Sequence, residues 1–135
     1  MNTPSQTTNM CVILPPTMER LADVELLRQT PNLSVHHIGY DDPPAVRDAR
    51  RRGQLTEELA AQCPTLSSQD AAALAGAEVV IARDLPLDLK RRAPKLRWVQ
   101  AVGAGIEQLD PPGLAELGIT LTNASGVAAA PIAEF

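Results

Sequence analysis

The stretch EVVIARDLPLDLKRRAPKLRWVQAV, residues 78–102, contains a complete strand–helix–strand repeat and decides the fold class. Its two ends, residues 78–82 and 96–102, are predominantly apolar runs, which are typical of strands buried on both faces of a parallel sheet. Between them Asp84 predicts the start of a helix, and the cations of residues 90–92 suit the negative end of its dipole. The repeat therefore predicts two parallel strands joined by a helical crossover.

The same alternation extends over the rest of the chain. The predicted strands are residues 11–14, 33–38, 78–82, 96–102 and 119–122. The predicted helices and helical turns are residues 21–27, 46–61 with a break at Gly53, 67–74, 84–92, 106–109 and 114–117. Strands that alternate with helices indicate a parallel sheet covered on both faces. We therefore expect an α/β fold, a flavodoxin-like doubly wound parallel sheet of about five strands. A last helix is predicted to start at Pro131 and is cut short at Phe135, so we expect the domain to be incomplete.

The composition is typical of a compact globular domain. Of the 135 residues, 44% are hydrophobic and 21% are charged, which distinguishes the chain from disordered sequences. The net charge of −4 gives no reason to expect a nucleic-acid partner. Residues 50–52 form a basic run, but acidic residues lie close by, so we interpret this run as a solvated helix face.

The sequence also bears on location and on metal binding. No apolar run approaches the roughly 20 residues that cross a bilayer, so no membrane partner is expected. Residues 1–9 are polar, do not resemble a secretory signal, and are predicted to be a disordered leader. Cys11 and Cys63 lack metal-ligand spacing, and no disulfide framework is expected. The composition favours a cytoplasmic location. His36 and His37 are adjacent on a predicted strand and point to opposite faces, so we expect neither a metal site nor an acid–base pair.

A loop with two glycines, residues 102–108, follows a predicted strand and precedes a helical turn, which is the context of a dinucleotide fingerprint. Gln108 occupies the third glycine position, and no acidic residue lies near Asn123, where the ribose-binding acid is expected. We therefore expect no cofactor-binding residue here. Glycines still let a backbone approach a ligand, and free N–H groups favour a small carboxylate. A plain tight turn is the alternative.

Three segments closely resemble the D-isomer-specific 2-hydroxyacid dehydrogenases, in that family's order and spacing. They are Leu96-Arg-Trp-Val-Gln-Ala-Val-Gly-Ala-Gly-Ile-Glu-Gln-Leu109, Gly118-Ile-Thr-Leu-Thr-Asn-Ala-Ser-Gly126 and Ala130-Pro-Ile-Ala-Glu-Phe135. The resemblance is close over residues 94–135 and architectural over residues 10–93. It implies that residues 10–127 are the N-terminal part of a substrate-binding domain. It also implies that residues 128–135 begin a helix leading to an absent NAD-binding domain.

The resemblance also implies a function and a site. The family transfers a hydride between NAD or NADP and a 2-hydroxy or 2-keto acid. In this chain, Val102 and Gly103 are then expected to offer backbone N–H groups to the substrate carboxylate. Arg83 is expected to contact the substrate, with a solvated arginine as the alternative. Asn123 and Ser125 belong to a turn and are expected to be structural.

The family's catalytic arginine, acid and histidine all lie beyond residue 135. The resemblance therefore implies no catalytic residue in this chain and no activity of the chain alone. NAD or NADP is expected in the full-length protein and is not expected to bind to this chain. The expected partner is a small 2-hydroxy or 2-keto acid, and the full-length protein is expected to be a homodimer.

Other functions are compatible with a doubly wound sheet. One is a non-catalytic binding module of the same fold, either a corepressor-like relative or a regulatory flavodoxin-like domain. Another is a phosphoacceptor receiver domain, which needs an acidic cluster after its first and third strands. Here the first strand ends in Leu14-Pro15-Pro16, and Asp41 and Asp42 follow the second strand instead. A stand-alone module of this length is a further alternative.

Overall fold

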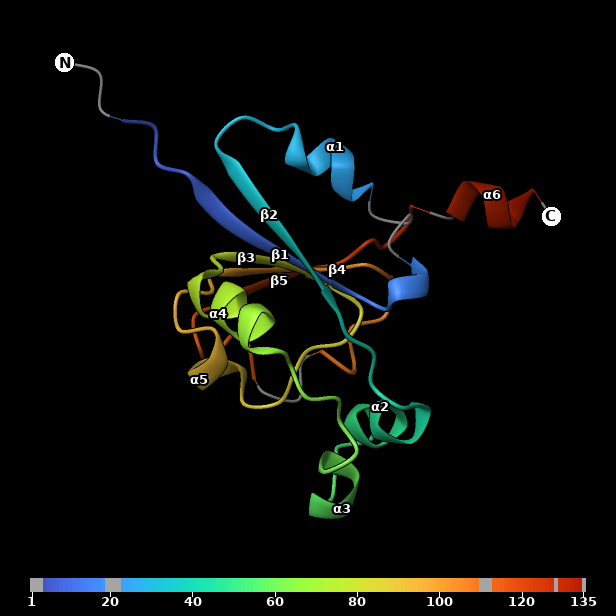
Figure 1. Cartoon of the computed structure of the whole chain (residues 1–135). Coiled ribbons are helices and arrows are strands. Elements are labelled where there is room, and N and C mark those ends of the chain that lie inside the picture. Colours follow the sequence, from blue (N-terminus) through green and yellow to red (C-terminus); the bar gives the residue numbers. More distant parts are fainter. Residues whose placement is uncertain (1–3, 19–22, 110–112, 128, 135) are drawn as a thin grey trace.

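The computed structural model describes residues 4–18, 23–109, 113–127 and 129–134. One sheet (Figure 1) contains the strands β1 Thr8–Leu14, β2 Leu33–Gly39, β3 Val79–Ala82, β4 Trp98–Ala101 and β5 Thr120–Thr122. The helices are α1 Val24–Arg28, α2 Pro44–Arg51, α3 Glu57–Ala60, α4 Ser68–Gly76, α5 Leu89–Arg92 and α6 Ala129–Ala133. None of the described helices has both the length and the hydrophobicity that crossing a bilayer requires.

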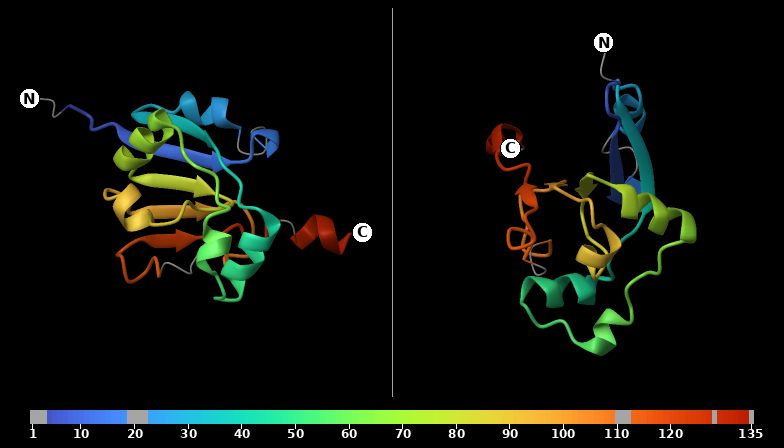
Figure 2. Two further views of the ribbon diagram at one scale, coloured as in Figure 1. Left: turned by 60° about the horizontal axis from the view of Figure 1, so that its bottom comes forward. Right: turned by 90° about the vertical axis from the view of Figure 1, so that its left-hand side faces the viewer.

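All neighbouring strands of the sheet are parallel, and their order is β2-β1-β3-β4-β5 (Figure 2). The chain starts at β1, moves outward to β2, and then returns past β1 to β3, β4 and β5. This reversal makes the sheet doubly wound, with a topological switch point between β1 and β3. The structure confirms the predicted flavodoxin-like α/β fold of about five strands.

Apolar clusters lie on both faces of the sheet. On one face, Ile13 and Val80 belong to a buried cluster that includes Leu74 of α4. On the other face, Val12 packs in a second cluster with Val24 of α1. Because side chains alternate along a strand, the neighbours Val12 and Ile13 point to opposite faces. Burial on both faces explains why the strands appear in the sequence as continuous apolar runs.

Among the differences from the predicted element boundaries, two concern the expected leader and the helix that was predicted to start at Asp84. Strand β1 already includes Thr8 and Asn9, so the end of the expected leader, residues 1–9, belongs to the sheet. Residues 1–3 lie outside the described part of the chain. The helix predicted to start at Asp84 is wrong in its first half, and only the short α5 forms. The reason is that Asp84 is buried in ion pairs and does not cap a helix.

The connection between β2 and β3 confirms the predicted helix with a break near Gly53. Helix α2 ends at Arg51, and Gly53 then adopts a φ of 65°, a left-handed conformation that favours glycine. Thr56 caps the next helix, α3, through its hydroxyl group. Ser67, one of two serines predicted to cap the following helix, accepts the Asp70 N–H over 3.1 Å at the start of α4.

Candidate functional site

The carboxyl ends of the parallel strands meet at one edge of the sheet, which we call the carboxyl edge. Ligands bind at this edge in doubly wound folds. The register pairs Ala82 of β3 with Ala101 of β4, so the next residues, Arg83 and Val102, lie side by side. Gly103 follows directly. The structure therefore brings together the three residues that the sequence analysis assigned to substrate binding.

The loop of residues 103–105 has unused hydrogen-bond donors. Within the described part of the chain, none of its backbone N–H groups donates a hydrogen bond. Gly103 is exposed, and the nearest atom to a Cβ built on it is the Gly105 nitrogen, 4.0 Å away. The backbone of the loop is therefore open to a ligand atom.

A second loop, which follows β5, holds the first one in place. Asn123 Nδ2 donates to Ala104 O over 3.0 Å, and the Ala124 N–H donates to Gly103 O over 3.1 Å. The Asn123 side chain also accepts the N–H of Ser125 over 3.1 Å, which is the local turn bond expected for it. These contacts engage two carbonyl groups of the first loop and none of its N–H groups. Asn123 and Ser125 thus have the structural role that was predicted.

The structure corrects the role predicted for Val102. Its N–H donates to Ala82 O over 3.0 Å and extends the β3–β4 ladder past the end of β4. A backbone N–H that is bonded within the sheet is not available to a carboxylate. Of the two N–H groups expected to bind the substrate, that of Gly103 is the open one among the described residues.

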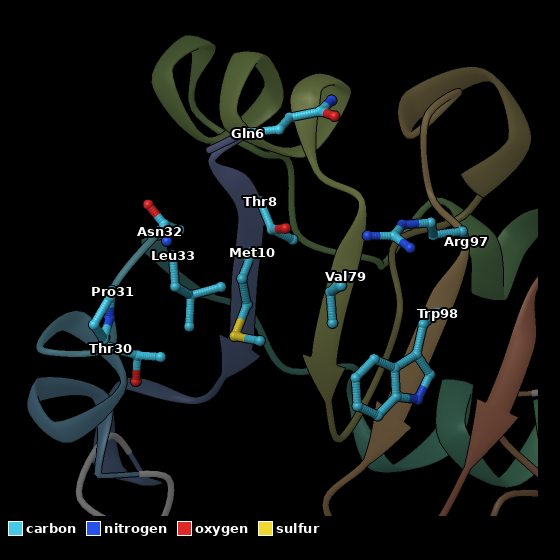
Figure 3. A pocket seen from close by; sticks show the side chains of 10 residues that line it. All are labelled: Gln6, Thr8, Met10, Thr30, Pro31, Asn32, Leu33, Val79, Arg97 and Trp98. Carbon is cyan, nitrogen blue, oxygen red and sulfur yellow. The ribbon is translucent and has the colours of Figure 1, made fainter. Parts of the chain in front are cut away.

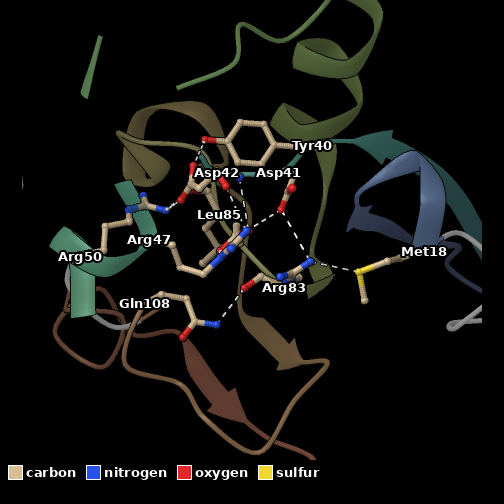
Figure 4. A network of polar contacts seen from close by, with 10 residues as sticks. Met18, Tyr40, Asp41, Asp42, Arg47, Arg50, Arg83, Leu85 and Gln108 are labelled. Carbon is tan, nitrogen blue, oxygen red and sulfur yellow. Dashed lines mark hydrogen bonds and ion pairs between the residues drawn. The ribbon is translucent and has the colours of Figure 1, made fainter. Parts of the chain in front are cut away.

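Arg83 combines a fixed backbone with a partly exposed side chain. Its N–H donates to Ile13 O over 3.3 Å, and its carbonyl accepts from Gln108 Nε2 over 3.1 Å. Its Nη1 lies 3.2 Å from Met18 Sδ and 3.8 Å from Asp41 Oδ1 (Figure 4). The side chain is 37% exposed. Arg83 is therefore ion-paired at the surface, rather than simply solvated.

Arg83 belongs to a chain of ion pairs that was not predicted from the sequence. Asp84 is fully buried, and its two carboxylate oxygens accept hydrogen bonds from Arg47 of α2, the shortest at 2.7 Å. Arg47 also donates to Asp41 over 2.5 Å, and Asp41 in turn faces Arg83. The ion-pair chain thus runs from the interior to the surface in the order Asp84, Arg47, Asp41, Arg83. Figure 4 labels its last three members.

A second ion pair lies beside this chain. Arg50 Nη1 donates to Asp42 Oδ2 and to Leu85 O, each over 2.6 Å, and Tyr40 donates to Asp42 Oδ1 over 2.7 Å. Arg50 is 4% exposed, so the interpretation of residues 50–52 as a solvated helix face is wrong for this residue. Arg50 follows a buried valine of α2 by one helical turn and therefore shares its inward face.

Burial and neighbouring charges act in opposite directions on these carboxyl groups. Burial raises the pKa of Asp84, but hydrogen bonds and attraction from Arg47 outweigh it and leave that pKa lowered. The pKa of Asp41 is raised, first by burial and then by its contact with Asp84, against the attraction of Arg47 and Arg83. Burial and the bond to the Asp42 carboxylate raise the pKa of Tyr40. Asp84 is therefore the charged inner end of the ion-pair chain.

The loop of residues 103–108 does not fit a dinucleotide. After residues 103–105 the chain makes a turn closed by the Leu109 N–H and Ile106 O over 2.8 Å, and no helix starts at this loop in the described residues. Gln108 stands where a third glycine would allow close packing, and its side chain bonds to Arg83 instead. We therefore assign no NAD or NADP site to this loop.

A hollow of about 450 Å³ lies at the opposite, amino-terminal edge of the sheet (Figure 3). Met10, Val79 and Trp98 line it from one face of the sheet. Arg97 also lines it and lies 3.8 Å from Glu78. The hollow contains no residue of the ion-pair chain or of the 103–105 loop, so it is separate from the candidate site.

The two histidines lie on β2, away from the candidate site. His36 is paired with Cys11 in the sheet register, and its Nε2 donates to Asp70 Oδ1 of α4 over 2.7 Å. In the described ranges, no group of three or more His, Cys, Asp or Glu side chains is arranged to hold a metal ion.

Comparison with known proteins relates the chain to one family. A family model described as D-isomer specific 2-hydroxyacid dehydrogenase, catalytic domain, matches residues 33–135. The match covers more than half of the chain. It includes the loops after β4 and β5 and all four residues of the ion-pair chain. No curated protein matches the sequence.

Proposed function

Because this chain belongs to the D-isomer specific 2-hydroxyacid dehydrogenases, through their catalytic domain, we propose that it binds the 2-hydroxy or 2-keto acid for hydride transfer with NAD or NADP. The observation that carries this proposal is that Arg83, at the end of β3, neighbours Val102, which directly precedes the open N–H groups of residues 103–105. A cationic side chain and unbonded backbone N–H groups are the partners that a small carboxylate requires. The acid is thus proposed to bind at the carboxyl edge.

In this arrangement the substrate carboxylate accepts hydrogen bonds from the Gly103 N–H and from the Arg83 guanidinium. Gly103 has no side chain, so a carboxylate oxygen can reach its backbone. Two points of attachment orient the neighbouring carbon atom, which carries the hydroxyl or keto group, for the transfer. This chain's residues are proposed to bind and orient the acid, and none of them is assigned a proton-transfer role.

The cofactor and the proton-transferring group are proposed to be held by residues other than these 135. The loop at the carboxyl edge does not fit a dinucleotide, and the chain's two histidines, His36 and His37, lie on β2. When bound, NAD or NADP supplies or accepts the hydride. A cytoplasmic location and a homodimer stay predictions from the sequence and the family.

An NMR titration with oxamate, an unreactive analogue of a 2-keto acid, tests the proposed site. We expect the amide signals of residues 103–105 to shift saturably. Arg83→Ala should weaken binding by about tenfold, because it removes a charge-assisted hydrogen bond. Arg97→Ala is the matched control, since Arg97 is an exposed arginine at the opposite edge of the sheet and should leave binding unchanged.

Two outcomes would contradict the proposed site: no saturable shift at residues 103–105, or equal weakening by the two arginine variants. Failure of 2-keto acids to bind at all would favour the alternative, a non-catalytic binding module of the same fold.

A further inference from the structure

We infer that the carboxylates of Asp41 and Glu107 select against substrates that carry a second negative group, so that 2-hydroxy or 2-keto monocarboxylates with an uncharged tail bind in preference. This inference rests on the proposed function, because it concerns the acid that binds beside Arg83. It assigns Asp41 a role in specificity and none in the transfer itself.

Asp41 lies between Arg47 and Arg83 (Figure 4). Its Oδ1 is 2.5 Å from Arg47 Nη2 and 3.8 Å from Arg83 Nη1. The distance to Arg83 is longer than a hydrogen bond, and the two side chains are 44% and 37% exposed. A substrate carboxylate can therefore bond to the guanidinium of Arg83 while Asp41 stays in place.

The charges of the described network are balanced before any ligand binds. Three carboxylates face three guanidinium groups, and these residues are Asp41, Asp42 and Asp84 with Arg47, Arg50 and Arg83. Arg47 and Arg50 are mostly buried against their own carboxylates, so Arg83 is the arginine of this network that a ligand can share. The single charge of Arg83 can balance one substrate carboxylate. A second negative group near Arg83 faces Asp41 without a counter-charge.

A further carboxylate lies beside the loop itself. A Cβ atom built on Gly105 would be 3.0 Å from Glu107 Oε2, so this exposed carboxylate comes close to the loop backbone. Negative charge therefore flanks the site both at the Arg83 side chain, through Asp41, and at the loop, through Glu107. Both carboxylates repel a dianion more than a monoanion.

Two ligands that differ in one terminal group test this inference. 2-Oxopentanoate and 2-oxoglutarate are 2-keto acids of equal chain length, and they end in a methyl group and in a carboxylate. We expect NMR titration of the protein to give tighter binding of 2-oxopentanoate, by about fivefold. Asp41→Asn should reduce this preference by a similar factor, mainly by strengthening the binding of 2-oxoglutarate. The asparagine oxygen can still accept the hydrogen bond from Arg47, so the fold is expected to persist.

Three comparisons separate an effect of charge from a general disturbance. Asp41→Glu keeps the charge and should keep the preference. Asp48→Asn removes an equal charge from the exposed face of α2, where Asp48 pairs with Arg52, and should also keep it. A rise in salt from about 0.05 M to about 0.5 M should weaken the wild-type preference, which a loss of packing would not explain. If Asp41→Asn does not fold, Glu107→Gln in the exposed turn gives the same test and should shift the preference in the same direction.

An unchanged preference in Asp41→Asn and Glu107→Gln overturns the inference and leaves the proposed function intact. Tighter binding of 2-oxoglutarate than of 2-oxopentanoate by the wild type also overturns it. If neither ligand moves the signals of residues 103–105, the proposed function itself fails, and the inference fails with it.

Discussion

At the scale of single residues, Gly103 shows whether access to the backbone matters for substrate binding. Its φ lies outside the left-handed region, and a Cβ there meets little, so a larger residue is expected to fold without strain. We expect Gly103→Val to weaken oxamate binding by about tenfold, because the branched side chain covers the N–H group. Gly103→Ala should weaken oxamate binding less than Gly103→Val does. Unaltered binding by the valine variant, measured by the same NMR titration, would show that the loop is only a turn.

Arg50 gives a second prediction at this scale, on stability. Arg50→Met removes the cation that faces the buried carboxylate of Asp42. We expect the free energy of unfolding to fall by about 3–5 kcal/mol, because an uncompensated charge is left in the interior. The neighbouring Arg51 is exposed, and Arg51→Met should change it by less than about 0.5 kcal/mol. Urea denaturation of both variants checks this. Equal losses of unfolding free energy would mean that the ion pair with Asp42 adds nothing beyond the contribution of any arginine in α2.

The same residues show how far the site could be predicted from the sequence. Gly103 and Arg83 follow directly after apolar runs, so their place at the carboxyl edge could be predicted from local pattern alone. The ion-pair chain could not, because Arg47 and Asp84 are 37 positions apart and look like ordinary surface charges. The bonded N–H of Val102 depends on the register between β3 and β4, which local pattern does not determine.

At the scale of the elements, Asp70 links α4 to β2 and makes this contact sensitive to pH. The hydrogen bond from His36 lowers the pKa of Asp70 more than burial raises it. A carboxyl group whose pKa is lowered by folding stabilises the fold at pH values above its ordinary pKa of 3.8. This stabilisation is lost as the pH falls through the lowered pKa. We therefore expect Asp70→Asn to unfold more easily than the wild type at pH 7, with a difference that shrinks below about pH 4.

Urea denaturation at several pH values measures this difference between the wild type and Asp70→Asn. Asp48→Asn, at an exposed position of α2, reports the effect of removing a carboxylate charge without that contact. A stability difference for Asp70→Asn that stays constant between pH 7 and pH 3 would contradict the role given to the His36 bond.

The elements also differ in how well the sequence predicts them. All five predicted strands are present, because burial on both faces produces a local apolar run that needs no knowledge of the partner strand. Helix α5 is shorter than predicted because its expected cap, Asp84, bonds to Arg47 of another helix. A capping residue near a strand end is thus an ambiguous signal when a distant arginine competes for it.

At the scale of the whole molecule, the candidate site depends on the complete sheet. Its groups come from the ends of β3 and β4, the loop after β5, and α2, which is held at the carboxyl edge through Arg47 (Figure 2). The doubly wound order of the strands could be predicted from their alternation with helices. The contact between the loops after β4 and β5 depends on side chains such as Asn123, whose partner no local pattern identifies.

A prediction for the whole chain concerns the cofactor. We expect calorimetric titration of residues 1–135 with NAD or NADP to give no saturable binding in the micromolar range. The loop of residues 103–105 leads into a turn, and Gln108 takes the place of the third glycine, so the pyrophosphate lacks its helix N-terminus. The oxamate titration on the same sample controls for a folded chain. Saturable binding of either nucleotide would overturn the interpretation of this loop.

Trp98 can serve as an intrinsic fluorescence probe. It is the single tryptophan of the chain, is 41% exposed on β4, and its Nε1 donates to Thr122 Oγ1 of β5 over 2.7 Å. The emission wavelength of an indole depends on how much water surrounds it, and this ring is part apolar and part wet. Without any label, a blue shift of the fluorescence would register a surface that closes over this face, and a red shift would register the separation of β4 from β5.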